Sequence, residues 1–296
     1  GPRTESYLPS WQRTAAREAA ARASEFRLSQ PPTRRMARRV QALAARAAYF
    51  AANAALRASA FLLWPRARPA DARQVCVYRI GHIGDIVCAL PAIACVRRAY
   101  PKARLTLLTS PGAKGTLGAA DVLAGSNLID DLWVYHSEDI DTLGKQRALL
   151  RDARARSFDV WIDLPNNLTT VSRQIRDMTF VRMAGAKWAR GWRIDSLNWA
   201  GQAQSEYLHF PNEVERTLDV VRQAGIDSQD VKFAIACPPE AKERVDALIE
   251  ERSFSADRLI AIAPGAKRST NLWLPERFAQ VGRDLSGHGY TILLIG

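Results

Sequence analysis

From residue 74 onwards, short apolar runs alternate with longer segments whose apolar residues recur at helical spacing. The apolar runs predict buried strands, and the periodic segments predict helices. Strands that alternate with helices form right-handed βαβ units, so the pattern indicates an α/β fold with a parallel sheet. The strands are expected at 75–79, 104–109, 129–135, 158–164 and 187–191, and the helices between them at 86–99, 142–156 and 169–183.

A second alternating segment begins near residue 231 and predicts strands at 232–236, 258–263 and 290–295 and helices at 239–251 and 275–285. Before it, 192–212 is polar and irregular like a linker, and a connecting helix is expected at 212–224. Because about three strands are too few for a complete parallel domain, the second domain is expected to be truncated. The predicted division is a helical extension at 1–73, a first Rossmann-like domain at 74–192, a linker with its helix at 193–230, and the start of a second Rossmann-like domain at 231–296.

In the extension, the helix expected at 33–64 is amphipathic. Five polar residues align along one ridge, and apolar residues fall on the opposing side. The ridge contains Arg35, Arg39, Arg46, Asn53 and Arg57, and the apolar side contains Met36, Val40, Leu43, Ala47, Phe50, Ala54 and Phe61. The arginines leave no uncharged run long enough to cross a membrane. Two interpretations stay open: the helix lies on an anionic membrane surface, or it packs on the protein's own body or on a second subunit.

The positive charge is concentrated in this extension. Residues 1–73 hold 14 Arg, no Lys and 4 acidic residues, which supply +10 of the formal net charge of +12. Because the segment lacks Lys and interleaved aromatic residues, nucleic acid is not an expected partner. The four cysteines, Cys76, Cys88, Cys95 and Cys237, form no CxxC pair, which predicts buried apolar side chains in a reducing compartment and no metal site.

The stretch VCVYRIGHIGDIVCAL at 75–90 joins a predicted strand to a predicted helix through a glycine turn. Ligands bind at this edge of open α/β sheets, where helix N-termini present free N–H groups. His82 and Asp85 occupy positions that are small in a dinucleotide-binding GxGxxG turn, which disfavours a Rossmann oxidoreductase. A carboxylate at a helix N-terminus also disfavours a pyrophosphate there. Asp85 is therefore either a reactive or ligand-binding group or an ordinary helix cap, and His82 either faces a ligand or is solvated.

The loop APGAKRST at 263–270 repeats this arrangement with the opposite charge. The chain tightens at Pro264 and Gly265, and Lys267 and Arg268 precede a predicted helix. Backbone amides beside cations form the environment that a diphosphate requires, although a solvated basic loop has the same composition. An acidic turn on one α/β unit and a basic turn on the other predict a cleft with a carboxylate on one wall and a phosphate site on the other.

Four segments in this order resemble glycosyltransferase family nine, the heptosyltransferase-like glycosyltransferases. YRIGHIGDIVCALPAIACVRRAYPKARLTLLT is similar to the family's N-terminal signature, and FDVWIDLPNN to its segment of an apolar strand between aspartates. NEVERTLDVVRQAGI resembles the helix before the family's second domain, and IAIAPGAKRSTNLWLPERFAQVGRDLSGHGYTILLIG its phosphate-loop region. The resemblance covers about residues 74–296.

The resemblance implies a GT-B fold, in which two Rossmann-like domains hold a glycolipid acceptor and a nucleotide-diphosphate sugar. It implies inverting transfer of a heptose-like sugar from an ADP-heptose-like donor to a lipopolysaccharide-core or related acceptor, with no metal or further cofactor. Asp85 is then the general base. Acceptor-binding residues are expected to be Arg79, Gly81, His82, Gly84, Asp163 and Asn166, and donor-phosphate residues Gly265, Ala266, Lys267, Arg268 and Asn271. The expected location is cytoplasmic, on the inner face of the bacterial cytoplasmic membrane, with self-association as a further expectation.

Two departures from the family pattern favour an alternative. Asn271 stands where the family commonly carries Lys, and an extra Leu274 separates Trp273 from Pro275. The family's later Asp-Thr-Gly element would follow residue 296. The alternative is a non-catalytic binding or scaffold module that is recruited to membranes by its basic helix. No GxSxG elbow occurs, which disfavours an α/β hydrolase.

Overall fold

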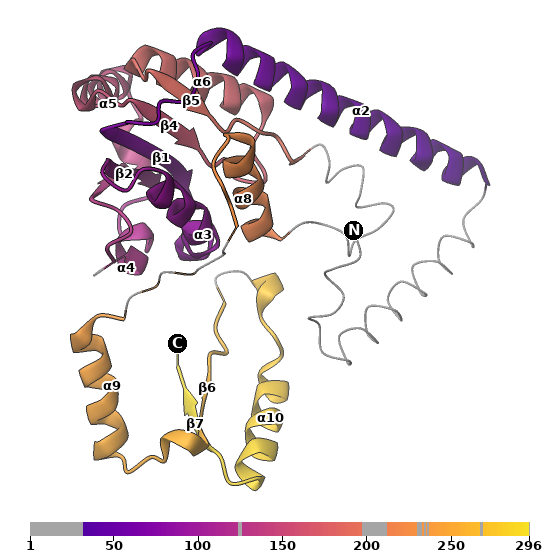
Figure 1. Ribbon diagram of the computed structural model, residues 1–296. Coiled ribbons are helices and arrows are strands. Elements are labelled where there is room, and N and C mark those ends of the chain that lie inside the picture. Colours follow the sequence, from indigo (N-terminus) through magenta and orange to yellow (C-terminus); the bar gives the residue numbers. More distant parts are fainter. Residues whose placement is uncertain are drawn as a thin grey trace. The chain divides into compact units, whose positions relative to one another are not determined.

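The computed structural model describes residues 32–123, 126–196, 212–229, 233, 235, 237–266 and 269–295 (Figure 1). The chain divides into two compact units, Gly1–Ala236 and Cys237–Gly296. The predicted linker lies mostly outside the described residues, as do Lys267 and Arg268. Of the strand predicted at 232–236, only Phe233 and Ile235 are described, and neither belongs to a strand.

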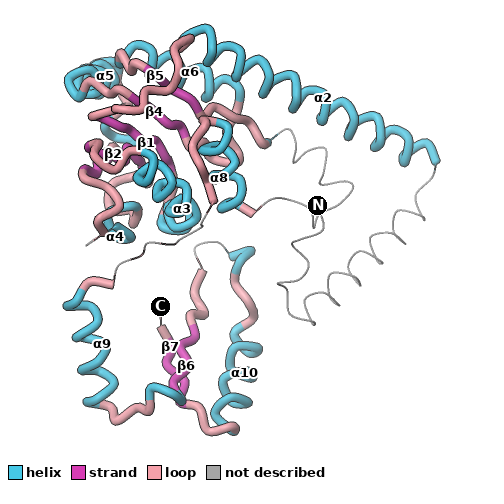
Figure 2. Tube along the Cα trace, viewed as in Figure 1, coloured by secondary structure: helices cyan, strands magenta, loops and turns pink. Residues whose placement is uncertain are grey.

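The first unit is built on a five-stranded sheet in the order β3-β2-β1-β4-β5. All four strand pairs are parallel, and β1 lies in the centre, as Figure 2 shows in magenta. This is the doubly wound order of Rossmann-like folds, in which ligands bind beyond the carboxyl ends of the strands. The strands are β1 (Gln74–Ile80), β2 (Arg104–Ser110), β3 (Asp131–Val134), β4 (Val160–Asp163) and β5 (Trp188–Arg190), each close to its predicted position.

Helices cover both faces of this sheet, so alternate side chains of each strand enter two different cores. Val75 and Val77 of β1 pack in one core with α3 and α8. Cys76 and Tyr78 pack in the other with residues of α2 and α6. The helices of the unit are α2 (Pro32–Leu63), α3 (Ile83–Ala99), α4 (Ala119–Leu123), α5 (Leu143–Arg156), α6 (Val171–Ala184) and α8 (Glu213–Gln223), with a short 3₁₀ turn η2 (Ser137–Asp139).

Helix α2 belongs to the first unit, which corrects its assignment to a separate extension. The side chain of Asn53 donates to the carbonyl of Ile194 at 2.9 Å and accepts from the N–H of Ile194 at 3.0 Å. Arg190 donates to the carbonyls of Ala60 and Trp64 at the carboxyl end of the helix, both at 3.2 Å. Asn53, predicted on a polar ridge, is therefore buried, and the C-terminal part of α2 packs on the protein's own body.

The second unit contains α9 (Pro239–Glu251), η4 (Ala256–Arg258), β6 (Leu259–Ile262), η5 (Ser269–Asn271), α10 (Pro275–Gly287) and β7 (Thr291–Leu294). β6 and β7 form a parallel pair. None of the unit's described residues is buried, and Val245, Leu248 and Val281 are exposed. Across the described part of the whole chain, no helix combines the length and the apolar character that a membrane crossing requires.

Candidate active site at the β1–α3 turn

The turn after β1 lies at the carboxyl edge of the sheet. The N–H of Gly81 donates to the carbonyl of Ser110, the last residue of β2, at 3.1 Å. Gly81 has a φ of +155°, and a Cβ at this position would lie 2.2 Å from the Cβ of Asp85. Only glycine therefore lets the side chain of Asp85 lie against the turn.

The Asp85 carboxylate is fixed at both oxygens. Its Oδ2 accepts from the N–H of His82 at 3.0 Å, so Asp85 does cap the start of α3. Its Oδ1 lies 3.5 Å from Nη2 of Arg79. The side chain still keeps 34% of its surface exposed. Asp85 is therefore an oriented carboxylate that a ligand can reach, and helix α3 begins at Ile83, earlier than predicted, because the glycine turn itself forms the first helical residues.

Arg79 lies beneath this turn and is fully buried. It donates to the carbonyls of Leu164 at 3.2 Å and Pro165 at 2.9 Å, and it pairs with Glu213 at 2.7 Å. A side chain with no exposed surface cannot contact an acceptor, so the prediction that Arg79 binds one is corrected. The structure makes it a positioning residue between Asp85 and Glu213.

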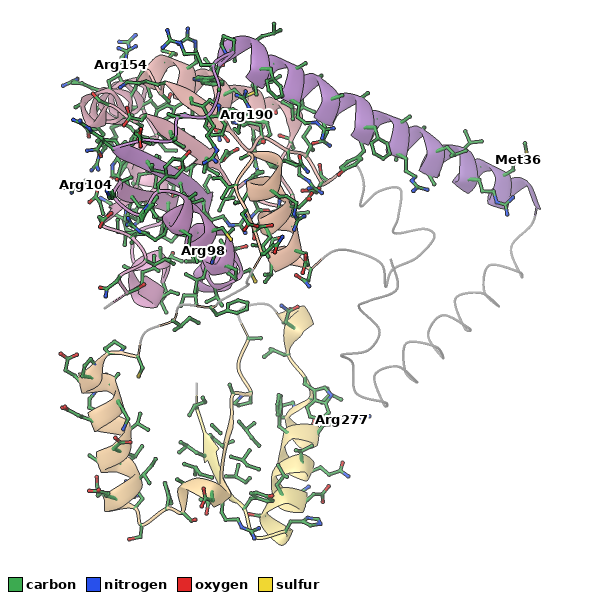
Figure 3. The ribbon with its side chains drawn as sticks, in the orientation of Figure 1. Met36, Arg98, Arg104, Arg154, Arg190 and Arg277 are labelled. Carbon is green, nitrogen blue, oxygen red and sulfur yellow. The ribbon has the colours of Figure 1, made fainter. Side chains whose placement is uncertain are left out.

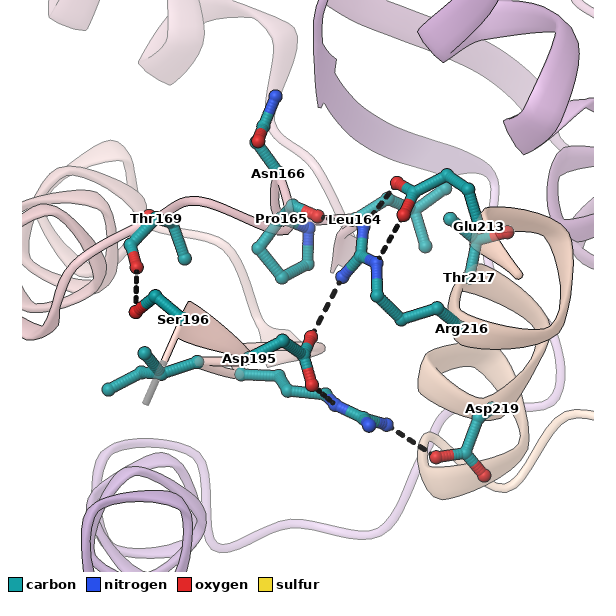
Figure 4. A network of polar contacts seen from close by, with 12 residues as sticks. Leu164, Pro165, Asn166, Thr169, Asp195, Ser196, Glu213, Arg216, Thr217 and Asp219 are labelled. Carbon is teal, nitrogen blue, oxygen red and sulfur yellow. Dashed lines mark hydrogen bonds and ion pairs between the residues drawn. The ribbon is translucent and has the colours of Figure 1, made fainter. Parts of the chain in front are cut away.

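A network of buried charges holds Arg79's partner in place (Figure 4). Arg216 pairs with Glu213 at 2.6 Å and with Asp195 at 3.1 Å, and it also donates to the carbonyl of Pro165. Burial acts to raise the pKa of Glu213, but Arg216 and Arg79 outweigh it and lower the pKa below its ordinary value. Glu213 is therefore an anion that is shared between two guanidinium groups. Such a network is costly to break, because removing one partner leaves a buried charge uncompensated.

Arg193 extends this network to helices α8 and α2. It pairs with Asp195 at 2.7 Å and with Asp219 of α8 at 2.5 Å, and it donates to the hydroxyl of Tyr49 at 3.3 Å. One network of polar contacts thus joins α8 and α2 to the backbone carbonyls that follow β4.

The other predicted acceptor residues divide into exposed and buried ones. His82 and Gly84 are exposed, and a Cβ at Gly84 would meet nothing within 4 Å. Asn166 is half-buried, and its side chain accepts from the N–H of Leu168 at 2.9 Å, which stabilises the turn after β4.

Asp163 is only 2% exposed, so the prediction that it contacts an acceptor is corrected. Burial, followed by the charge of Asp177, raises the pKa of Asp163 well above its usual range, against the opposing effects of Gln174, Arg79 and Arg216. The cause of both errors is the same: a polar residue at the carboxyl end of a strand can lie under a site as well as in it.

In the second unit, the predicted phosphate loop lies between β6 and α10. Gly265, Ala266 and Asn271 are exposed there, and a Cβ at Gly265 would meet nothing within 4 Å. Lys267 and Arg268 lie outside the described residues. Among the residues that the structure describes, no cluster of three His, Cys, Asp or Glu side chains could hold a metal ion.

Sequence reasoning missed Glu213 and Arg216 as parts of the site. Both are in NEVERTLDVVRQAGI, which stood out only as a predicted helix with a family likeness. The available signal is the acidic first turn of α8 after Asn212, whose side chain accepts from the N–H of Glu215 at 2.9 Å. That pattern marks a helix start, but it does not identify the distant arginine that pairs with it.

The comparisons agree on one family. The model of glycosyltransferase family 9 (heptosyltransferase) matches residues 146–296, a range that excludes the β1–α3 turn. Lipopolysaccharide heptosyltransferase 3 of Escherichia coli (strain K12) is 22% identical over 222 residues, which are 71% of this chain and 59% of that protein. This chain therefore spans about three fifths of the length of that relative.

A solved structure has a similar fold. The crystal structure of the glycosyl transferase family 9 from Veillonella parvula DSM 2008 superimposes with a TM-score of 0.59 at 17% identity. The match covers 77% of this chain and 64% of that one.

Proposed function

Because the chain belongs to glycosyltransferase family 9, we propose that the full protein transfers a sugar from a nucleotide-diphosphate donor to a lipopolysaccharide-core or related glycolipid acceptor. The family description and the relative from Escherichia coli both name heptosyl transfer, which favours a heptose-like sugar and an ADP-heptose-like donor. The observation that carries the proposal is the Asp85 carboxylate, oriented by His82 and Arg79 and still exposed.

In the proposed reaction, Asp85 removes the proton from an acceptor hydroxyl as that oxygen attacks the anomeric carbon. The new C–O bond forms as the bond from the anomeric carbon to the diphosphate breaks, and the electron pair leaves with the diphosphate. Attack from the face opposite the leaving group inverts the anomeric configuration. Arg79 acts through Asp85, whose carboxylate it contacts, and Glu213 acts one step further away by holding Arg79.

The donor diphosphate is proposed to bind the loop between β6 and α10. The exposed backbone at Gly265 and Ala266 offers N–H groups to an anion, and Asn271 adds a polar side chain. Lys267 and Arg268 supply positive charge in the sequence of that loop. These groups stabilise the charge on the leaving group, so the proposed mechanism requires no metal.

We propose that an anionic membrane surface binds the N-terminal half of α2. Met36, Val40, Leu43 and Phe50 are exposed along one side of this helix. At 3.6 residues per turn, that side is about a third of a turn from the side that packs on the body. Arg39 and Arg46 lie beside the apolar stripe, and α2 contains no acidic residue.

Figure 1 shows this half of α2 extending beyond the sheet of the first unit, and Figure 3 labels Met36 at its far end. An apolar stripe flanked by arginines fits the boundary between anionic headgroups and acyl chains. The proposed location is therefore the inner face of the cytoplasmic membrane, where a glycolipid acceptor would be met.

One observation favours a second candidate, a non-catalytic membrane-recruited scaffold. Asn271 stands where the family pattern expects Lys, so donor binding is the step in which this chain departs from its family.

The product distinguishes the two candidates. The native full-length protein is incubated with ADP-heptose and a lipopolysaccharide-core acceptor, and the anomeric configuration of donor and product is read by NMR. We expect transfer with inversion. Retention would contradict general-base attack, whereas membrane binding without transfer would favour the scaffold.

A further inference from the structure

Three exposed apolar side chains gather where the turn after β4 enters helix α6. Leu168 is 62% exposed, Val171 41% and Ile175 53%. Val171 and Ile175 are four residues apart and therefore lie on one side of the helix, and Leu168 stands in the turn that leads into it. We call these three residues the α6 patch. Exposed apolar residues that cluster in this way mark a contact surface, whereas single ones need no explanation.

The backbone around Leu168 is fixed. Its N–H donates to Oδ1 of Asn166 at 2.9 Å, and the N–H of Thr169 donates to the carbonyl of Asn166 at 3.0 Å. Thr169 is buried, and its carbonyl accepts from the hydroxyl of Ser196 at 3.0 Å, as Figure 4 shows. Leu168 is therefore held in its exposed position by a hydrogen-bonded turn.

The charge beside the patch is positive. Arg173, Arg176 and Arg182 of α6 are all exposed. Asp177, the one acidic residue in the sequence of α6, is mostly buried and pairs with Arg176 at 2.7 Å. Apolar side chains flanked by arginines fit the boundary between anionic headgroups and acyl chains. The N-terminal half of α2 has the same combination of exposed apolar residues and arginines.

The patch and the N-terminal half of α2 lie at the same end of the first unit. Ile194, which bonds to Asn53, follows the carboxyl end of β5. Ala186, whose carbonyl accepts from the indole N–H of Trp64 at 2.8 Å, precedes β5. Helix α2 therefore runs from the carboxyl edge of the sheet to the amino edge, and its N-terminal half projects beyond the carboxyl edge. The turn after β4 lies at that edge as well.

The patch is also on the side of α6 that is directed towards α2. Phe180 of α6 lines a cavity beside α5. Val171 precedes it by nine residues, which is about half a turn around the helix. Gln174, about a sixth of a turn from Val171, accepts from the N–H of Arg193 at 2.8 Å, and the neighbouring Ile194 anchors α2.

We propose that the α6 patch is a second membrane contact, which inserts into an anionic lipid surface together with the N-terminal half of α2. The end of the sheet at which β4 and β5 finish then lies next to the bilayer. Arg79, which contacts Asp85, is held by the carbonyls of Leu164 and Pro165, in the turn that also carries Leu168. A glycolipid headgroup therefore reaches Asp85 while its acyl chains stay in the membrane. The inference rests on the membrane location proposed for α2, but it does not require transfer.

Hydrogen–deuterium exchange of the native full-length protein, with and without phosphatidylglycerol vesicles, tests the two contacts separately. Peptides over 164–176 report on the patch, and peptides over 32–50 report on α2. We expect vesicles to slow exchange in both. Slower exchange at 32–50 alone overturns the α6 contact and leaves the α2 contact standing, whereas slower exchange at 164–176 alone supports the patch and contradicts the α2 contact. No change in either overturns both.

Two double variants test the side chains themselves. Leu168→Ser with Ile175→Ser should weaken binding to phosphatidylglycerol vesicles at least about tenfold, because two apolar side chains no longer insert. The matched control is Leu62→Ser with Met183→Ser, two exposed residues at the amino-edge ends of α2 and α6, which should bind vesicles like the wild type.

Equal losses in the two double variants, or no loss in the first, overturn the proposal. Unchanged vesicle binding, together with the loss of a dimer in analytical ultracentrifugation, would assign the patch to a second copy of the chain. Because none of these measurements requires transfer, a failure of the transfer proposal leaves them readable.

Discussion

At the residue scale, Gly81 and Gly84 have opposite reasons to be glycine, although both are in the same turn. Gly81 is required by the fold, because a Cβ there would overlap the Asp85 side chain at 2.2 Å. Gly84 meets nothing within 4 Å, so the fold does not require it. An exposed glycine in the first turn of a helix, beside the exposed Asp85 carboxylate, leaves space for a ligand to approach.

This contrast predicts opposite effects of alanine. Gly81→Ala should lower the free energy of unfolding by about 1–3 kcal/mol, because the backbone or Asp85 must shift. Gly84→Ala should leave it unchanged or raise it by up to about 1 kcal/mol, because alanine favours a helix. Urea denaturation of both variants measures the difference, and equal stability of the two would show that Asp85 does not lie against Gly81.

The buried Asp163 predicts a pH-dependent effect. Burial raises its pKa in the folded state, so the folded protein binds this proton more tightly than the unfolded chain. The carboxyl therefore contributes stability at low pH, and that contribution is lost as pH rises through the folded pKa. Asp163→Asn removes this titration, so its unfolding free energy relative to the wild type should rise as the pH is raised above about 4, the ordinary pKa of an aspartate. A difference that stays constant over this range would place the carboxyl in solvent.

For individual residues, the sequence predicts the position of the turn but not which of its neighbours are buried. The pattern located Asp85 and the glycines, because a strand followed by a glycine turn and a helix is a local signal. The pattern predicted that Arg79 and Asp163 bind the acceptor, because it could not show that both side chains are buried. The partner of Arg79, Glu213, is 134 residues away. Pairings of that separation are set by the tertiary fold and leave no local trace.

At the scale of elements, most strands and helices were predictable to within a few residues. Strands buried on both faces of a parallel sheet read as continuous apolar runs, which are distinct from the helical periodicity between them. Two of the departures have physical reasons. Helix α3 starts earlier than its apolar pattern, and the packing of α2 rests on Asn53, a polar residue whose two hydrogen bonds to Ile194 imitate a backbone partner.

Helix α2 gives a prediction of its own. Arg39→Glu with Arg46→Glu should reduce cosedimentation with anionic vesicles at least about tenfold, because each arginine near the headgroups contributes about 1 kcal/mol. The matched control is Arg147→Glu with Arg151→Glu, which makes the same charge change on the exposed face of α5.

The wild-type protein should bind vesicles that contain phosphatidylglycerol, should release them as salt is raised, and should bind phosphatidylcholine weakly. Equal losses of vesicle binding in the two double variants would show that net charge alone, and not the position of Arg39 and Arg46, determines binding. No vesicle binding, together with dimers in analytical ultracentrifugation, would assign the apolar stripe to a second copy of the chain.

At the scale of the whole molecule, the two units carry different parts of the proposed chemistry. The first has two packed cores and the oriented carboxylate, and the second has two mostly half-buried strands and the loop proposed for the donor diphosphate. The sequence indicated this division through its two alternating segments. It did not show that helix α2 is part of the first unit, because the contacts that join them come from Arg190, Arg193 and Ile194, which were assigned to the end of the first domain and to a linker.

Asp85 is proposed to be the base for transfer, in addition to its role as a helix cap. Single-turnover transfer by the native full-length protein is measured for Asp85→Asn and for Asp121→Asn. Asp121 is the matched control, because its Oδ2 accepts from the N–H of Gly118 at 2.8 Å at the start of α4, the same cap geometry without the turn. Asparagine keeps the cap in both variants but cannot take a proton. We expect Asp85→Asn to slow transfer at least about 100-fold and Asp121→Asn to match the wild type. Transfer by Asp85→Asn within a few-fold of the wild type would contradict it.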